Sequence, residues 1–162
     1  MTTETTTPLP TTPLVQRPDE APTYSMSPTE QMRFLFSGAV GQPEFYEERV
    51  ARGDGPPLHR HAWATWEYLI EGELRVVIDD EELRVAAGDF FYTPPNATHT
   101  YVVESDTARI IGFNHPGGHF EDLNREVAPM FLEPGGPDMQ AVVERAAAHG
   151  VEILGPPLGA ET

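Results

Sequence analysis

The middle of the chain consists of short runs in which apolar and polar residues alternate. Between Met32 and Phe113 these runs are rich in β-branched and aromatic residues, and Gly, Pro and Asp separate them, as is typical of half-buried strands. They predict eight strands, at residues 32–36, 44–50, 63–70, 74–78, 83–85, 90–93, 100–103 and 108–113. Eight short strands at this spacing indicate an all-β fold, either an antiparallel barrel or a jelly roll.

The hydrophobic period changes after His119. Phe120, Leu123 and Val127 recur at helical spacing, and a second amphipathic stretch runs from 139 to 147, where His149-Gly150 would close it. We therefore expect a helical tail at residues 117–162 that packs on one end or face of the barrel, and we assign the barrel itself to residues 29–116.

The first 28 residues are rich in Thr, Pro and Glu. They offer too little apolar surface to offset the entropy of ordering them, so residues 1–28 are predicted to form a mostly disordered arm. The alternative is an arm that packs on a partner subunit, anchored by apolar residues such as Leu14 and Tyr24.

The charge of the chain excludes two classes of partner. The formal net charge is −16, and all ten basic residues are arginines, so neither nucleic acid nor an anionic membrane surface would attract the protein. The N-terminal residues do not show the basic segment followed by an apolar segment that is typical of a signal peptide, and the sequence contains no apolar run of membrane-spanning length. We therefore expect a cytoplasmic protein. It has no cysteine, which rules out disulfides, thiolate catalysis and Cys-ligated zinc.

Three histidines carry the candidate chemistry. His59 and His61 are two residues apart, so on an extended strand both imidazoles lie on one face. His99 follows a Pro-Pro-Asn turn and begins another predicted strand. Three convergent neutral imidazoles with open coordination positions are typical of a catalytic metal site.

The spacing of these residues resembles the two motifs of the cupin superfamily. Gly53, His59, His61 and Gly72 match the first motif, and Gly88, Pro94 and His99 match the second. Asn96 stands where the family has Gly, a mild change because Asn tolerates a positive φ, and Val103 stands where it has Asn. The resemblance covers about residues 32–114 and implies a cupin jelly-roll barrel, followed here by the short helical tail.

The fourth metal ligand of cupins is a glutamate, and the corresponding position in this sequence is Thr65. Glu67 lies two residues further on and shares its strand face unless a bulge intervenes. An inward carboxylate would bind the metal, act as a general base, pair with an arginine or be protonated, and these alternatives stay open here. Thr65 is expected to hydrogen-bond metal-bound water or substrate. Without Glu67 as a ligand, the all-imidazole site favours an anionic, chelating substrate.

Within the superfamily, the chain looks like one-domain cupins of the quercetin dioxygenase-like group. This resemblance implies one divalent transition metal per chain (Fe, Ni, Mn, Co, Cu or Zn), a small enolic or phenolic substrate, dioxygen as co-substrate, and a homodimer. Trp63 and Tyr101 share the parity of the histidines and are predicted to line the substrate pocket. Two alternatives are a lyase, isomerase or polyketide cyclase that does not use dioxygen, and a cupin that binds a small molecule without catalysis.

Overall fold

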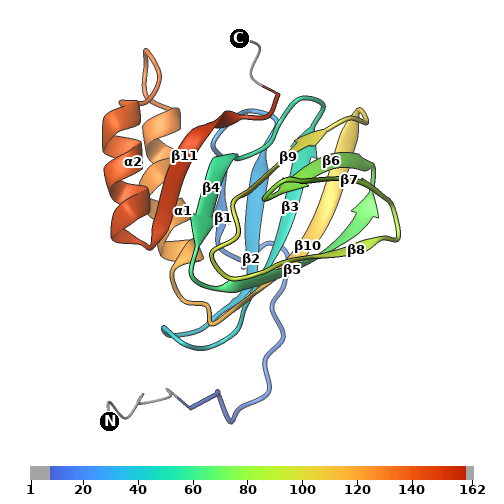
Figure 1. Ribbon diagram of the computed structural model, residues 1–162. Coiled ribbons are helices and arrows are strands. Elements are labelled where there is room, and N and C mark those ends of the chain that lie inside the picture. The colour runs from blue at the N-terminus through green and yellow to red at the C-terminus, as the bar shows by residue number, and fades with distance from the viewer. Residues whose placement is uncertain (1–7, 160–162) are drawn as a thin grey trace, which may run out of the picture.

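The computed structural model describes residues 8–159 of the chain, and within them the elements form a β-barrel flanked by two helices (Figure 1). The strands and helices are, in order, β1 (Thr23–Tyr24), β2 (Gln31–Ser37), β3 (Glu44–Ala51), β4 (Pro57–His61), β5 (Ala64–Glu71), β6 (Glu73–Ile78), β7 (Glu81–Ala86), β8 (Phe90–Thr93), β9 (His99–Val103), β10 (Thr107–His115), α1 (Phe120–Phe131), α2 (Met139–Ala148) and β11 (Val151–Pro157).

The strands form two antiparallel sheets. One has six strands in the order β1-β2-β3-β10-β5-β8, and the other has five in the order β11-β4-β9-β6-β7. Strands distant in the sequence are neighbours in both sheets, as a jelly roll requires. The predicted all-β jelly-roll fold with helices near the C-terminus is therefore confirmed.

All eight predicted strands are present, and three further strands were not in the prediction. The short strand β1 lies within the predicted arm and pairs with β2, and β4 carries His59 and His61. The third, β11, lies in the tail, for which helices alone were predicted, and pairs antiparallel with β4. The chain thus returns to the barrel after α2 and supports the strand that holds two of the histidines.

Alternation along the strands decides which side chains face the barrel interior. In β10 the buried residues are Ala108, Ile110, Gly112 and Asn114, and the residues between them are more exposed. The interior of the barrel is filled mainly by apolar side chains from both sheets: Val50, Leu69, Leu74, Val76, Ile78, Val85, Phe91, Ala97, Tyr101, Val103, Ala108 and Ile110. These side chains pack against one another and fill the space between the two sheets.

A second apolar cluster joins the helices to the barrel. Trp63 packs there with residues of both helices and of β11, namely Leu123, Val127, Val142, Ala146 and Val151. Figure 1 shows α1 and α2 side by side next to β11, on one side of the barrel. Of the helices described, neither has the length and apolar character needed to cross a lipid bilayer.

Candidate metal centre

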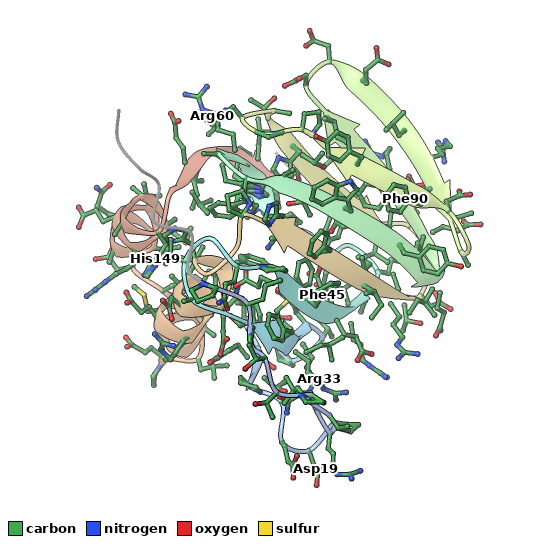
Figure 2. All side chains as sticks on the ribbon, turned by 90° about the horizontal axis from the view of Figure 1, so that it is seen from below. Asp19, Arg33, Phe45, Arg60, Phe90 and His149 are labelled. Carbon is green, nitrogen blue, oxygen red and sulfur yellow. The ribbon has the colours of Figure 1, made fainter. Side chains whose placement is uncertain are left out.

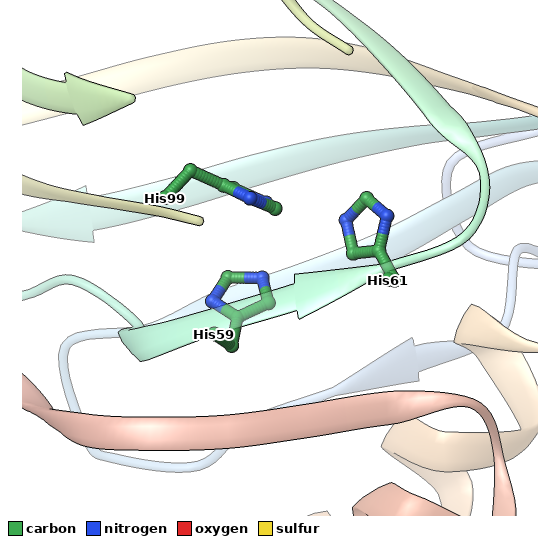
Figure 3. Close-up of side chains that lie close together, drawn as sticks. All are labelled: His59, His61 and His99. Carbon is green, nitrogen blue, oxygen red and sulfur yellow. The ribbon is translucent and has the colours of Figure 1, made fainter. Parts of the chain in front are cut away.

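The three predicted histidines meet inside the barrel. His59 and His61 lie on β4, and His99, the first residue of β9, pairs directly with His59. Each offers one ring nitrogen to a group in which these atoms lie within 4.8 Å of one another. The ring centroids of His59 and His99 are 4.1 Å apart, and those of His61 and His99 are 4.7 Å apart. Figure 3 shows the three imidazoles pointing toward one another from the two strands.

The backbone fixes the tautomer of every ring. Nδ1 of His59 lies 2.8 Å from the carbonyl oxygen of Pro57, that of His61 lies 3.0 Å from Trp63, and that of His99 lies 2.9 Å from Ala97. A carbonyl only accepts, so each Nδ1 carries the proton and each Nε2 keeps its lone pair free. This is the arrangement that orients imidazoles toward a metal.

Burial keeps the imidazoles neutral. It lowers the pKa of His59 and of His61 to about 3, with a further lowering from the neighbouring His99 in both cases. The pKa of His99 is lowered too, again chiefly by burial. Neutral imidazoles with oriented Nε2 atoms are the donors that Zn, Cu, Fe, Ni and similar divalent ions take, so the residues present fit a transition metal.

The turn before β9 explains how His99 reaches the site. Asn96 has φ of 64°, the left-handed conformation that Asn accepts more readily than most residues. Its backbone N–H donates to the carbonyl oxygen of His61 at 2.7 Å. The turn thereby ties the segment before His99 to the strand of the other two histidines, and Asn serves where the family motif has Gly.

Trp63 supports the centre from the helix side. Its ring stacks on His61 with a centroid distance of 4.1 Å and an interplanar angle of 5°. It is buried among α1, α2 and β11, in the second apolar cluster. β11 also pairs with β4, with Val151 opposite His61 and Ile153 opposite His59. The C-terminal segment thus supports β4 in two ways, by strand pairing and by packing on Trp63.

Thr65 faces the interior and belongs to a chain of buried polar groups. Its hydroxyl donates to Oδ1 of Asn114 at 2.8 Å, and Nδ2 of Asn114 donates to the Glu44 carboxylate at 3.2 Å. Glu44 in turn accepts the backbone N–H of Glu121 in the first turn of α1 at 3.0 Å. Because the Thr65 proton is directed to Asn114, the hydroxyl oxygen is left as an acceptor.

Glu67 is buried in the barrel and bonded to a phenol. The hydroxyl of Tyr46 donates to its Oε1 at 3.1 Å. Burial raises the pKa of Glu67 to about 7, and the bond from Tyr46 opposes that rise. Among the described residues Glu67 has no arginine partner in an ion pair, and the metal-binding group does not include it. Of the four alternatives, its surroundings therefore favour the two in which the carboxyl takes up a proton, as a general base or as a protonated group.

A glycine makes this bond possible. Gly112 of β10 lies between Tyr46 and Glu67 in register, since it pairs with both. A Cβ at this glycine would come within 1.9 Å of Tyr46 Cζ and 2.3 Å of its hydroxyl oxygen. The ring of Tyr46 therefore crosses β10 through the space that the missing side chain leaves.

A second carboxyl and phenol pair lies nearby and was not predicted. Tyr101, expected in the pocket, is buried in the barrel and donates to Oε1 of Glu48 at 2.5 Å. Burial, followed by the charge of Glu30, raises the pKa of Glu48 to about 8. The shared parity of Glu44, Tyr46 and Glu48 along β3 was the available signal, because three polar residues on the buried face of a strand are uncommon.

Comparisons with known proteins agree with this architecture. A family model described as a cupin domain matches residues 46–111. Quercetin 2,3-dioxygenase from Bacillus subtilis is 27% identical over 161 residues, covering 88% of this chain and 48% of that protein. The chain therefore spans about half the length of this curated relative.

Solved structures show the same barrel. An RmlC-like cupin from Shewanella frigidimarina superposes with a TM-score of 0.56 at 21% identity, over 62% of this chain and 88% of that one. The polyketide cyclase RemF from Streptomyces resistomycificus superposes with a TM-score of 0.52 at 19% identity, over 65% and 79% of the two chains. At these identities the likeness establishes the fold. Together with the family match and the curated relative, it supports a cupin domain at residues 46–111 of this chain.

Proposed function

We propose that this chain is a metal-dependent cupin enzyme of the dioxygenase type that acts on a small, chelating enolic or phenolic compound. The observation that supports it most is the set of three imidazoles whose Nδ1 protons are all bound by backbone carbonyls. A divalent transition metal held by His59, His61 and His99 would supply Lewis acidity and, if redox-active, a place for dioxygen to react. The curated relative is a quercetin dioxygenase, which favours this reaction class.

The protein's own residues would handle the proton of the substrate. Glu67 is the proposed general base, and Tyr46 occupies its Oε1, so Oε2 is the oxygen that would accept the enol or phenol proton. A base is most effective when its pKa lies near the working pH, and the pKa of Glu67 is raised to about 7. Thr65, with its own proton directed to Asn114, would accept a hydrogen bond from a hydroxyl of the substrate or from water.

The pocket walls belong to the same proposal. We assign Tyr101 and Trp63 to the surroundings of the substrate, Tyr101 through its place on β9 two residues after His99 and Trp63 through its stack on His61. One metal per chain, a homodimeric assembly and a cytoplasmic location complete the proposal.

A second candidate is a lyase, isomerase or cyclase that uses the same metal without dioxygen. It is favoured by Thr65, because the carboxylate ligand of the family is missing while an acid and base pair, Glu67 with Tyr46, is buried in the barrel. Proton transfer at a polarised carbonyl needs those two components and no oxidant.

Elemental metal analysis of the purified chain tests the proposal. We expect about one transition metal per chain, lost in His99→Ala and kept in Glu67→Gln, with turnover of flavonols or other enols lost in both variants. Fe, Ni, Mn, Co or Cu together with substrate-dependent oxygen uptake would support the oxygenase. Zn with full anaerobic turnover would support the second candidate, and a chain that binds no metal after reconstitution would leave a non-catalytic binding protein.

A further inference from the structure

The direction of the His99 ring depends on a loop, unlike that of the other two imidazoles. His59 and His61 both lie on β4, and Figure 2 shows Arg60, which separates them, pointing away from the barrel, so that its two neighbours point inward. His99 is the first residue of β9, and residues 94–98 before it belong to no strand or helix. A ring at the end of such a segment needs further contacts to fix its direction.

Asp79 supplies these contacts from the neighbouring hairpin. β6 ends at Ile78, which pairs with His99, and Asp79 follows in the turn to β7. The Oδ1 atom of Asp79 accepts the backbone N–H of Thr98 at 2.9 Å and the Thr98 hydroxyl at 3.2 Å. In return, the backbone N–H of Asp79 donates to the Thr98 carbonyl at 2.7 Å. One turn residue therefore binds all three polar groups of the residue that precedes His99.

The first of these bonds reaches the imidazole through a single peptide group. The N–H of Thr98 and the carbonyl of Ala97 belong to the same trans peptide, so they point in opposite directions within one plane. That carbonyl accepts the Nδ1 proton of His99 at 2.9 Å. The Asp79 carboxylate, the Ala97–Thr98 peptide and the His99 imidazole thus form a continuous hydrogen-bonded row, which we call the Asp79 relay.

The relay affects the imidazole in two ways. The carboxylate holds the peptide plane in place, and with it the carbonyl that orients the ring. Its bond to the N–H is charge-assisted, and it polarises the peptide so that the carbonyl becomes a stronger acceptor. Groups that bind the second nitrogen of a metal-ligating histidine orient the ring and raise its basicity. Asp79 is placed to act in this way on His99, one peptide further out.

The other two histidines have no carboxylate in this position. Their Nδ1 protons are bound by the carbonyls of Pro57 and Trp63. Among residues 8–159, no carboxylate accepts the N–H at the other end of either of those peptides. His59 and His61 are therefore internal controls for His99.

We propose that Asp79 is a positioning residue of the metal centre, which fixes the His99 imidazole through the Ala97–Thr98 peptide. The inference rests on the metal site of the proposed function and adds to it an exposed residue of the β6–β7 turn. Metal affinity then depends on a side chain that acts only through the histidine.

The affinity for Zn²⁺, measured on the full chain by competition with a chromophoric chelator, tests the proposal. Asp79 has φ of 50°, a conformation that glycine adopts without strain, so Asp79→Gly removes the carboxylate and leaves the turn intact. Its dissociation constant should rise about 10-fold or more. Asp79→Asn keeps an oxygen that can accept both bonds and should stay within about threefold of the wild type. Asp80→Gly, the same change at the exposed neighbour in this turn, is the matched control and should bind as the wild type does.

Hydrogen exchange of the imidazole protons, followed by NMR in the metal-free protein, gives a readout that a general loss of stability would not produce. In the wild type the Nδ1 protons of all three histidines should exchange slowly, because each is bound to a carbonyl. In Asp79→Gly the proton of His99 should exchange faster, while those of His59 and His61 stay unchanged. Asp79→Asn should restore slow exchange at His99.

Three results would overturn the proposal. The first is an Asp79→Gly protein with wild-type Zn²⁺ affinity and an unchanged His99 proton. The second is an equal loss of affinity in Asp80→Gly, which would show a general effect of the turn. The third is an Asp79→Asn protein that binds as weakly as Asp79→Gly, which would contradict positioning by hydrogen bonds. A wild-type chain that binds no Zn²⁺ would instead refute the metal site of the proposed function, and the exchange of the His99 proton would still decide whether Asp79 holds the ring.

Discussion

Replacing Gly112 by alanine tests how the barrel interior positions its carboxyl. The new Cβ would lie 1.9 Å from Tyr46 Cζ and 2.4 Å from Cε2, far inside van der Waals contact. The ring of Tyr46 is buried and bounded by Phe34 and Phe120, with ring centroids 6.3 and 5.2 Å away. It therefore has to shift within a packed core, and its bond to Glu67 is lost.

The expected cost follows from those two effects. Overpacking of a well-filled core costs about 1–3 kcal/mol, and a buried polar partner left without its hydrogen bond costs about 1–3 kcal/mol more. We expect Gly112→Ala to lower the free energy of unfolding by about 3 kcal/mol, measured by urea denaturation followed by circular dichroism. For a domain of this size the midpoint of thermal unfolding should fall by roughly 10 °C.

Two controls isolate the collision with Tyr46. Gly155→Ala is the same substitution in another strand, where the nearest atoms, of Leu58, are 3.6 Å from the new Cβ, so it should cost less than about 0.5 kcal/mol. In a Tyr46→Ala background the ring is gone, and Gly112→Ala should again cost little. An equal cost of Gly112→Ala with and without Tyr46, or a negligible cost in the wild type, would refute the account of the glycine.

Two further predictions concern pH and the metal centre. The pKa of Glu67 is raised from 4.5 to about 7, so the folded state holds a proton that the unfolded state releases between these values, and stability falls as pH rises through that window. Metal-free wild type should lose up to about 3 kcal/mol relative to Glu67→Gln between pH 4.5 and pH 8, and parallel pH profiles of the two proteins would contradict the raised pKa. Trp63 stacks on His61 at 4.1 Å, so in Trp66→Phe, where it is the remaining tryptophan, its fluorescence should change when Zn²⁺ or Co²⁺ is added. The matched Trp63→Phe variant keeps Trp66 on the outer sheet and should not respond; equal responses of the two would argue against metal binding at His61.

Much of the fold could be predicted because it depends on local alternation. Every predicted strand occurs in the structure, α1 contains the three residues at helical spacing, and α2 covers the predicted stretch from 139 to 147. The missed strand β11 contains Gly155 and two prolines, which are residues that strands generally avoid. Its pairing with β4 holds this segment in an extended conformation that its composition alone does not favour.

The histidine centre was also predictable, for a geometric reason. The spacing of His59 and His61 places both rings on one face of any strand, and the turn containing Asn96 accepts the positive φ that the motif requires. The partners of these rings could be anticipated less well, because each Nδ1 bonds to a carbonyl whose direction depends on the local turn.

The sequence by itself determined eight of the eleven strands described and the residues able to hold a metal, since these follow from periodicity and spacing within one segment. Only the tertiary structure decided that Glu67 meets Tyr46 across Gly112, that Glu48 meets Tyr101, and that Trp63 packs between His61 and the helices. Such contacts join segments that are distant in the chain. Alternation tells which side chains enter the barrel, but strand order and register determine which of them touch.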